Sequence, residues 1–135
     1  MTKEMIVYPV VIRRTDDEEV PYFVYVPDFD SATQGVTLAD AMFMAEDLLC
    51  CLATDYQDEG KELPASSELK YVEHEDDDIV TLVAADLNEY RKMQDTTAVR
   101  KNVSLPAWLS YSAEKAGLSL SSVLQTALKQ ELHLN

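Results

Sequence analysis

The charged residues of this sequence are divided unevenly between its two ends. Up to Asp95 there are 7 basic and 23 acidic residues, a net charge of −16, whereas from Thr96 onward there are 4 basic and 2 acidic residues, a net charge of +2. Such a division indicates two modules that serve different partners. The sequence therefore predicts an acidic domain over residues 1–93, a polar linker over 94–98 and a small basic domain over 99–135.

The composition of the whole chain narrows the class of protein. A formal net charge of −14 argues against a general binder of nucleic acid or of an anionic membrane surface, because both depend on Lys and Arg. No apolar run approaches the roughly 18 residues of a membrane span, and no secretory signal is visible behind Met1. Cys50 and Cys51 are adjacent and pair badly with each other. We expect a soluble, cytoplasmic protein.

The acidic domain begins with the pattern of a small sheet. Residues 5–12 and 22–26 are rich in β-branched and aromatic residues and predict two strands. Pro9 favours an edge position or a bulge in the first of them. Residues 27–35 carry turn chemistry with room for one further strand, and Gly35 is available for a positive φ.

One long amphipathic helix follows the turn segment. Thr37 is a good N-cap, Asp40 can complete a capping box, and apolar residues recur at helical spacing until Gly60. Two strands and a helical turn are then expected, at residues 69–72, 79–85 and 86–93. The fold class is α+β, with a helix packed on a small antiparallel sheet.

Two groups of carboxylates have the residue types of a metal site. The acidic run at residues 73–78 lacks the spacing of a calcium-binding loop and is interpreted as a solvated loop. Asp28, Asp30 and Asp86 could gather as a nuclease-type metal cluster, but turn chemistry and capping explain each of them more simply. No phosphate-binding glycine loop is present. We therefore expect no catalytic residue, no metal and no cofactor, and hence no enzyme.

Aromatic residues gather in the first part of the acidic domain, and they have two readings. They could complete the core, or they could form an apolar patch on the sheet face that the helix leaves open, where aromatic side chains often anchor protein interfaces. The residues are Tyr8, Tyr22, Phe23, Tyr25 and Phe29.

The basic domain reads as one strand followed by two helices, with Pro106 at the start of the first helix, Gly117 at its end and Ser119 capping the second. This unit is too small to close a core alone, so we expect it to dimerise. Two copies would pair their strands as an antiparallel ribbon and bury their apolar stripes. The expected dimerisation residues are Val103, Leu105, Trp108, Val123, Leu124 and Leu128.

A two-stranded ribbon fits the major groove of DNA. Arg100, Asn102 and Ser104 alternate on the outward side of the strand, and Arg and Asn can each form two hydrogen bonds to a purine. The free backbone N–H groups at the start of the second helix suit a phosphate. We expect that contact to involve Ser119, Ser121 and Ser122.

The order of these motifs resembles two known families. The segment Arg100-Lys101-Asn102-Val103-Ser104-Leu105-Pro106, with residues 117–122, resembles a ribbon-helix-helix DNA-binding domain. The acidic domain is similar to the N-terminal domain of HicB antitoxins, which has a partial RNase H-like fold. The matching segments are residues 8–12, 26–28, 33–37 and 80–90.

The resemblance implies an antitoxin of a type II toxin–antitoxin pair. Its acidic domain would bind and neutralise a small basic HicA-type toxin, a ribonuclease that cleaves mRNA. Its ribbon-helix-helix domain would form a homodimer or a tetramer, bind operator DNA and repress the operon. The residues expected to contact the toxin are Tyr8, Tyr22, Tyr25, Asp28, Phe29 and Asp30. A ribbon-helix-helix regulator with a ligand-sensing N-terminal domain is the alternative reading.

Overall fold

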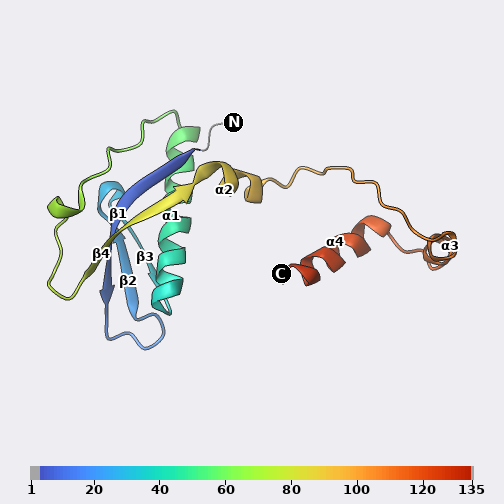
Figure 1. Cartoon of the computed structure of the whole chain (residues 1–135), viewed down its shortest axis with the longest axis horizontal. Coiled ribbons are helices and arrows are strands. Elements are labelled where there is room, and N and C mark those ends of the chain that lie inside the picture. The colour runs from blue at the N-terminus through green and yellow to red at the C-terminus, as the bar shows by residue number, and fades with distance from the viewer. Residues whose placement is uncertain (1–3, 135) are drawn as a thin grey trace. The chain divides into compact units, whose positions relative to one another are not determined.

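A computed structural model describes residues 4–134 and divides the chain after Thr96 into two compact units (Figure 1). The first unit holds a four-stranded antiparallel sheet with strand order β3-β2-β1-β4. The strands are β1 (Met5–Arg14), β2 (Tyr22–Val26), β3 (Ser31–Gly35) and β4 (Ile79–Asp86). Register is fixed by the pairs of Val11, which lies opposite Tyr25 of β2 and Val80 of β4.

The first strand is central, not at the edge that Pro9 suggested. Pro9 pairs with Leu82 of β4, and the pairing with β2 begins only at Val11. On the β2 side Pro9 therefore lies beyond the paired residues, where a missing N–H costs no ladder bond.

One part of the expected strand pattern is confirmed and another needs correction. The further strand for which residues 27–35 left room is β3, and the 3-10 helix η1 (Pro27–Phe29) leads directly into it. The strand expected at 69–72 is wrong, since η2 (Leu69–Tyr71) is a 3-10 helix there. Only Val72 of that segment is buried, while Tyr71 is exposed, so one apolar anchor holds the segment and no alternating face exists to join a sheet.

Helix α1 (Leu38–Asp58) confirms the expected helix and its ends. Thr37 Oγ1 accepts a hydrogen bond from Asp40 N at 3.0 Å, and Asp40 Oδ2 accepts one from Val36 N at 2.9 Å, one residue before the usual capping-box donor. Gly60 follows the helix with φ +73°, the left-handed conformation of a helix C-terminus.

The core lies between α1 and one face of the sheet (Figure 1). Alternate residues of the strands point toward the helix, and the helix meets them mainly with small side chains at four-residue spacing. These are Ala41, Ala45, Leu49 and Ala53 on α1, opposite Val10, Ile12, Val24, Val26, Val83 and Ala85. Helix α2 (Leu87–Gln94) follows β4 directly and is capped by Asp86, as the sequence predicted for 86–93.

The second unit contains α3 (Ala107–Lys115) and α4 (Leu120–Glu131). Pro106 and Ser119 precede these helices, and Gly117 between them has φ +70°, in agreement with the expected boundaries. Residues 95–106 form no helix or strand in this single chain. A ribbon strand needs hydrogen bonds from a second chain, so the ribbon stays a prediction.

Candidate functional site

The aromatic residues of the acidic unit fall into two groups. Tyr8 is only 4% exposed; its Oη donates to the Pro64 carbonyl at 2.5 Å and its ring packs edge-on against Phe29, with centroids 4.9 Å apart. Phe29 in turn packs against Tyr56 of α1 at 5.3 Å. Burial raises the pKa of Tyr8. These rings, with the partly buried Tyr22, belong to the core side of the sheet.

The sheet face opposite α1 carries the other group. Because Val24 and Val26 point into the core, the alternating residues Phe23 and Tyr25 point away from it. Tyr25 Oη donates to Asp30 Oδ1 at 2.6 Å, and this hydrogen bond raises the pKa of Tyr25. Asp30 has φ 47°, which turns the chain between η1 and β3. Phe23 is exposed and Tyr25 partly exposed, whereas Pro9 and Val11 of β1 on the same face are buried. The open part of this face therefore lies at β2, and it is aromatic, with the Asp30 carboxylate hydrogen-bonded at its edge.

The three carboxylates weighed as a metal cluster have separate structural roles. Asp28 accepts hydrogen bonds from Ser67 N at 2.9 Å and from Ser67 Oγ at 2.5 Å, which fasten the long loop after α1. Asp86 Oδ1 accepts from Glu89 N at 3.1 Å as the N-cap of α2. Within residues 4–134 no three His, Cys, Asp or Glu side chains are grouped so that they could hold a metal ion. The nuclease reading finds no support in this geometry.

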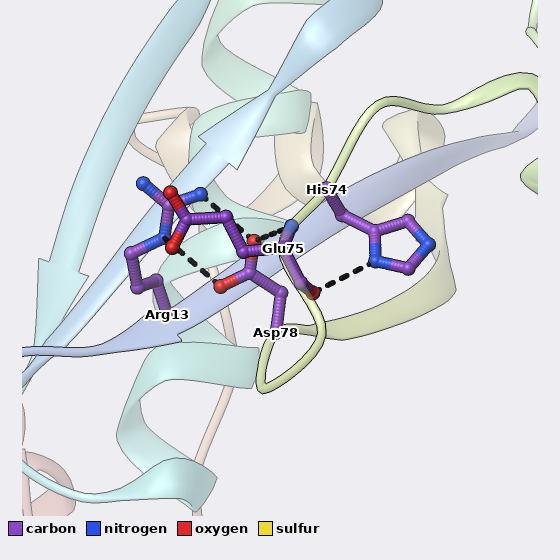
Figure 2. Close-up of polar contacts among 4 residues, drawn as sticks. All are labelled: Arg13, His74, Glu75 and Asp78. Carbon is purple, nitrogen blue, oxygen red and sulfur yellow. Dashed lines mark hydrogen bonds and ion pairs between the residues drawn. The ribbon is translucent and has the colours of Figure 1, made fainter.

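The acidic loop at residues 73–78 is not wholly solvated (Figure 2). The Arg13 guanidinium donates to Asp78 twice, from Nε to Oδ1 at 2.9 Å and from Nη2 to Oδ2 at 2.8 Å, and Glu75 N donates to the same carboxylate at 2.8 Å. The Asp78 side chain is 2% exposed. The Arg13 hydrogen bond, followed by the bond from Glu75 N, lowers the pKa of Asp78 to about 2.

Sequence reasoning missed a groove of about 350 Å³ between α1 and α2. Apolar residues and carboxylates line it together, and its lining contains no Lys or Arg. A signal was present, because α1 carries five acidic residues and no basic one. Neither segment alone could have predicted that α2 lies beside these carboxylates, because the two helices are far apart in the sequence. We define the α1–α2 groove by Phe43, Glu46, Asp47, Asp86, Glu89, Tyr90 and Met93.

The second unit exposes the residues that the sequence assigned to DNA and to dimerisation. Arg100, Asn102 and Ser104 lie in the segment without helix or strand, and Ser119, Ser121 and Ser122 lie at the start of α4. The apolar residues expected to dimerise have no core to enter in a single chain, and Trp108 is 68% exposed. The others, also exposed, are Val103, Leu105, Val123, Leu124 and Leu128.

Comparisons with known proteins bear on the identity of the chain. Two solved structures share its fold. One is a chain of a toxin–antitoxin complex from Streptococcus pneumoniae, with TM-score 0.60 and 24% identity over 95% of this chain and 99% of that one. The other is the antitoxin HicB of Burkholderia pseudomallei, with TM-score 0.52 and 21% identity over 95% and 97%. No curated protein matches the chain.

In the part of the chain that the structure describes, no helix is long and apolar enough to cross a membrane. A family model described as a HicB-like antitoxin of a bacterial toxin–antitoxin system matches residues 8–125, which includes nearly all of the sheet, α1, α2, α3 and the start of α4. The chain therefore belongs to the HicB-like family of antitoxins, whose members are not enzymes.

Proposed function

We propose that this antitoxin binds and neutralises a small basic HicA-type toxin through its acidic unit, and that its second unit dimerises and represses the operon. The observation that carries the proposal is the family match over residues 8–125. The charge of −16 up to Asp95 supports the same proposal, because a strongly negative surface attracts a basic toxin and speeds its association.

Four of the proposed toxin-facing residues lie at the end of the sheet around η1. Asp28, Phe29 and Asp30 lie in or next to this short helix, and Tyr25 lies on the open face beside Asp30. Tyr22, at the other end of β2, stands against the Arg14 guanidinium, which lies 5.4 Å from its ring centroid. Tyr8 is buried, so its part is to support Phe29 from beneath.

The second unit is proposed to be a ribbon-helix-helix dimer. The six apolar residues expected at the dimer interface are all exposed to water in the single chain, and a second copy would bury them. Pairing two segments of residues 99–105 would place Arg100, Asn102 and Ser104 of both chains on one ribbon. A charge of +2 per chain is small for DNA, which supports binding as a dimer or a larger assembly.

Coexpression with a candidate toxin, a small basic protein encoded by a neighbouring reading frame, tests the first half of this proposal. We expect the full chain to restore growth and to copurify with the toxin. If the chain neither restores growth nor binds the purified toxin, a HicA-type toxin is not its partner. A ligand-sensing regulator would instead bind DNA without any such partner.

Substitutions in the ribbon test the second half. We expect Arg100→Ala and Asn102→Ala each to weaken operator binding by about 1–3 kcal/mol, the worth of one good bidentate base contact. Neutralisation of the toxin should be unchanged, which serves as the control for folding. Normal operator binding by both variants would show that these side chains do not read the groove.

A further inference from the structure

The α1–α2 groove has an apolar interior that the fold of a single chain leaves uncovered. Phe43 on α1 is 64% exposed and Met93 on α2 is 71% exposed. Two further residues line the groove, Tyr90, which is half-buried against the core, and Cys50, which is buried. Exposed aromatic and Met side chains around a concavity are typical of surfaces that adapt to a protein partner.

Carboxylates surround this apolar interior. Glu46 and Asp47 are exposed on α1, and Asp86 and Glu89 stand at the first turn of α2. None of the four forms an ion pair with a Lys or Arg among residues 4–134, whereas Arg91 of α2 pairs with Asp58 at 3.1 Å, and neither Arg91 nor Asp58 lines the groove. Burial, followed by the nearby carboxylates Glu46, Asp47 and Asp86, raises the pKa of Cys50, which also lines the groove, to about 11.

The charge pattern decides between possible occupants. A second acidic unit would bring another strongly negative surface to the same place and be repelled. A cationic side chain with an apolar neighbour complements both features, because its aliphatic stem can lie on Phe43 and Met93 while its charge meets the carboxylates.

We propose that the α1–α2 groove receives a Lys or Arg side chain of the toxin, together with an apolar residue next to it. This inference rests on the proposed function and names a contact surface distinct from the residues around η1. The carboxylates confer attraction and orientation, and the apolar residues confer the slow release that charge alone on an exposed surface does not give.

Binding kinetics of the full chain on the immobilised HicA-type toxin test this inference. The double variant Glu46→Lys/Asp47→Lys reverses two groove charges. The matched control Asp55→Lys/Glu62→Lys changes the net charge by the same amount at exposed positions that do not line the groove. A second pair, Phe43→Ser against the exposed Tyr71→Ser, tests the apolar part.

We expect both charge variants to slow association alike, because long-range steering follows net charge. Dissociation should become faster by about tenfold or more only in the groove variants Glu46→Lys/Asp47→Lys and Phe43→Ser. The variant Glu46→Gln/Asp47→Asn removes the two negative charges without reversing them. Its dissociation rate should lie between that of Glu46→Lys/Asp47→Lys and that of the wild-type chain.

The outcomes separate this inference from the proposed function. If the wild-type chain does not bind the toxin, the proposed function fails and the inference falls with it. If the wild-type chain binds and the groove variants dissociate like their controls, the inference alone is overturned. A groove variant that changes the sedimentation of the free chain, with toxin dissociation unchanged, would show that a second copy fills the groove and would equally overturn it.

Discussion

Gly35, the last residue of β3, lies close against the backbone of α1 at Ala41. A Cβ atom at this position would lie 2.5 Å from Ala41 N and 2.6 Å from Ala41 Cα. The sequence suggested that Gly35 supplies a positive φ, but the positive-φ glycines of the described chain are Gly60 and Gly117. Glycine is needed at position 35 because it has no side chain. The nearest atoms that a Cβ would meet belong to the backbone of Ala41, which cannot move aside as a flexible side chain can.

We therefore expect Gly35→Ala to destabilise the acidic unit by about 3 kcal/mol, at the upper end of ordinary overpacking costs. Chemical denaturation followed by circular dichroism measures the loss. Gly60→Ala is the matched control, because a Cβ there meets no atom within 4 Å and only the φ of +73° is unfavourable. Its cost should be about 1 kcal/mol. Equal losses in the two variants would refute the close-approach explanation.

The Arg13–Asp78 pair gives the stability of the acidic unit a defined pH dependence. The pKa of Asp78 is lowered to about 2 in the folded chain, below the value of about 3.9 for an unfolded Asp. A depressed carboxyl pKa stabilises the fold above the unfolded pKa, and the contribution is lost as the pH falls toward the folded pKa. The relevant window is therefore about pH 4 to pH 2.

Asp78→Asn should lower the midpoint of thermal unfolding at pH 7, and its difference from the wild-type chain should shrink as the pH falls through that window. Asp77→Asn, in the same loop and exposed, is the control and should change little. Thermal unfolding followed by circular dichroism from pH 7 to pH 2 measures both. A difference that persists undiminished at pH 2 would mean that ionisation of Asp78 does not stabilise the loop.

At the scale of elements, the sequence predicted helices better than strands. Thr37, Gly60 and Ser119 mark helix ends through bonds to residues three or four positions away, so the signal is local. The 69–72 segment has strand-like residues, yet whether a strand forms depends on a partner elsewhere in the chain. The central place of β1 likewise depends on β4, which lies about seventy residues later.

The candidate surfaces were predictable to the extent that they are local. Alternation along β2 separates Tyr22 from Tyr25 once the inward face is known, but the sequence alone does not say which face meets α1. Asp78 was interpreted as solvated because its partner Arg13 lies 65 positions away. The α1–α2 groove joins residues about forty positions apart, so no short motif could reveal it.

The second unit shows the same division between local features and features that depend on distant contacts. Its two helices follow local capping signals and were predicted. The proposed ribbon and the proposed core would need contacts between chains, and in the single chain the apolar residues are exposed and residues 99–105 form no strand. Dimerisation therefore stays a prediction about the assembly of two chains, which the elements of one chain cannot test.

At the scale of the whole molecule, the uneven distribution of charge is compatible with two proposed interactions, one with a cationic protein and one with DNA. A charge of −14 spread evenly over the chain would favour the first and oppose the second. The charge of the acidic unit repels nucleic acid and attracts cationic proteins, whereas the second unit, with its net charge of +2, lacks that repulsion. The two interactions should therefore separate when the chain is cut between its units, after Thr96.

A chain that ends at Thr96 keeps the sheet, α1, α2 and the core between them, and we expect it to bind the toxin. Its association rate should fall as salt is raised from about 0.05 to 0.5 M, because screening shortens the reach of its charge. Operator binding and dimerisation should be lost. Titration with toxin and with operator DNA measures these effects, and the full chain is the control. A truncated chain that still binds the operator would place DNA recognition in the acidic unit, against the repulsion that its charge imposes.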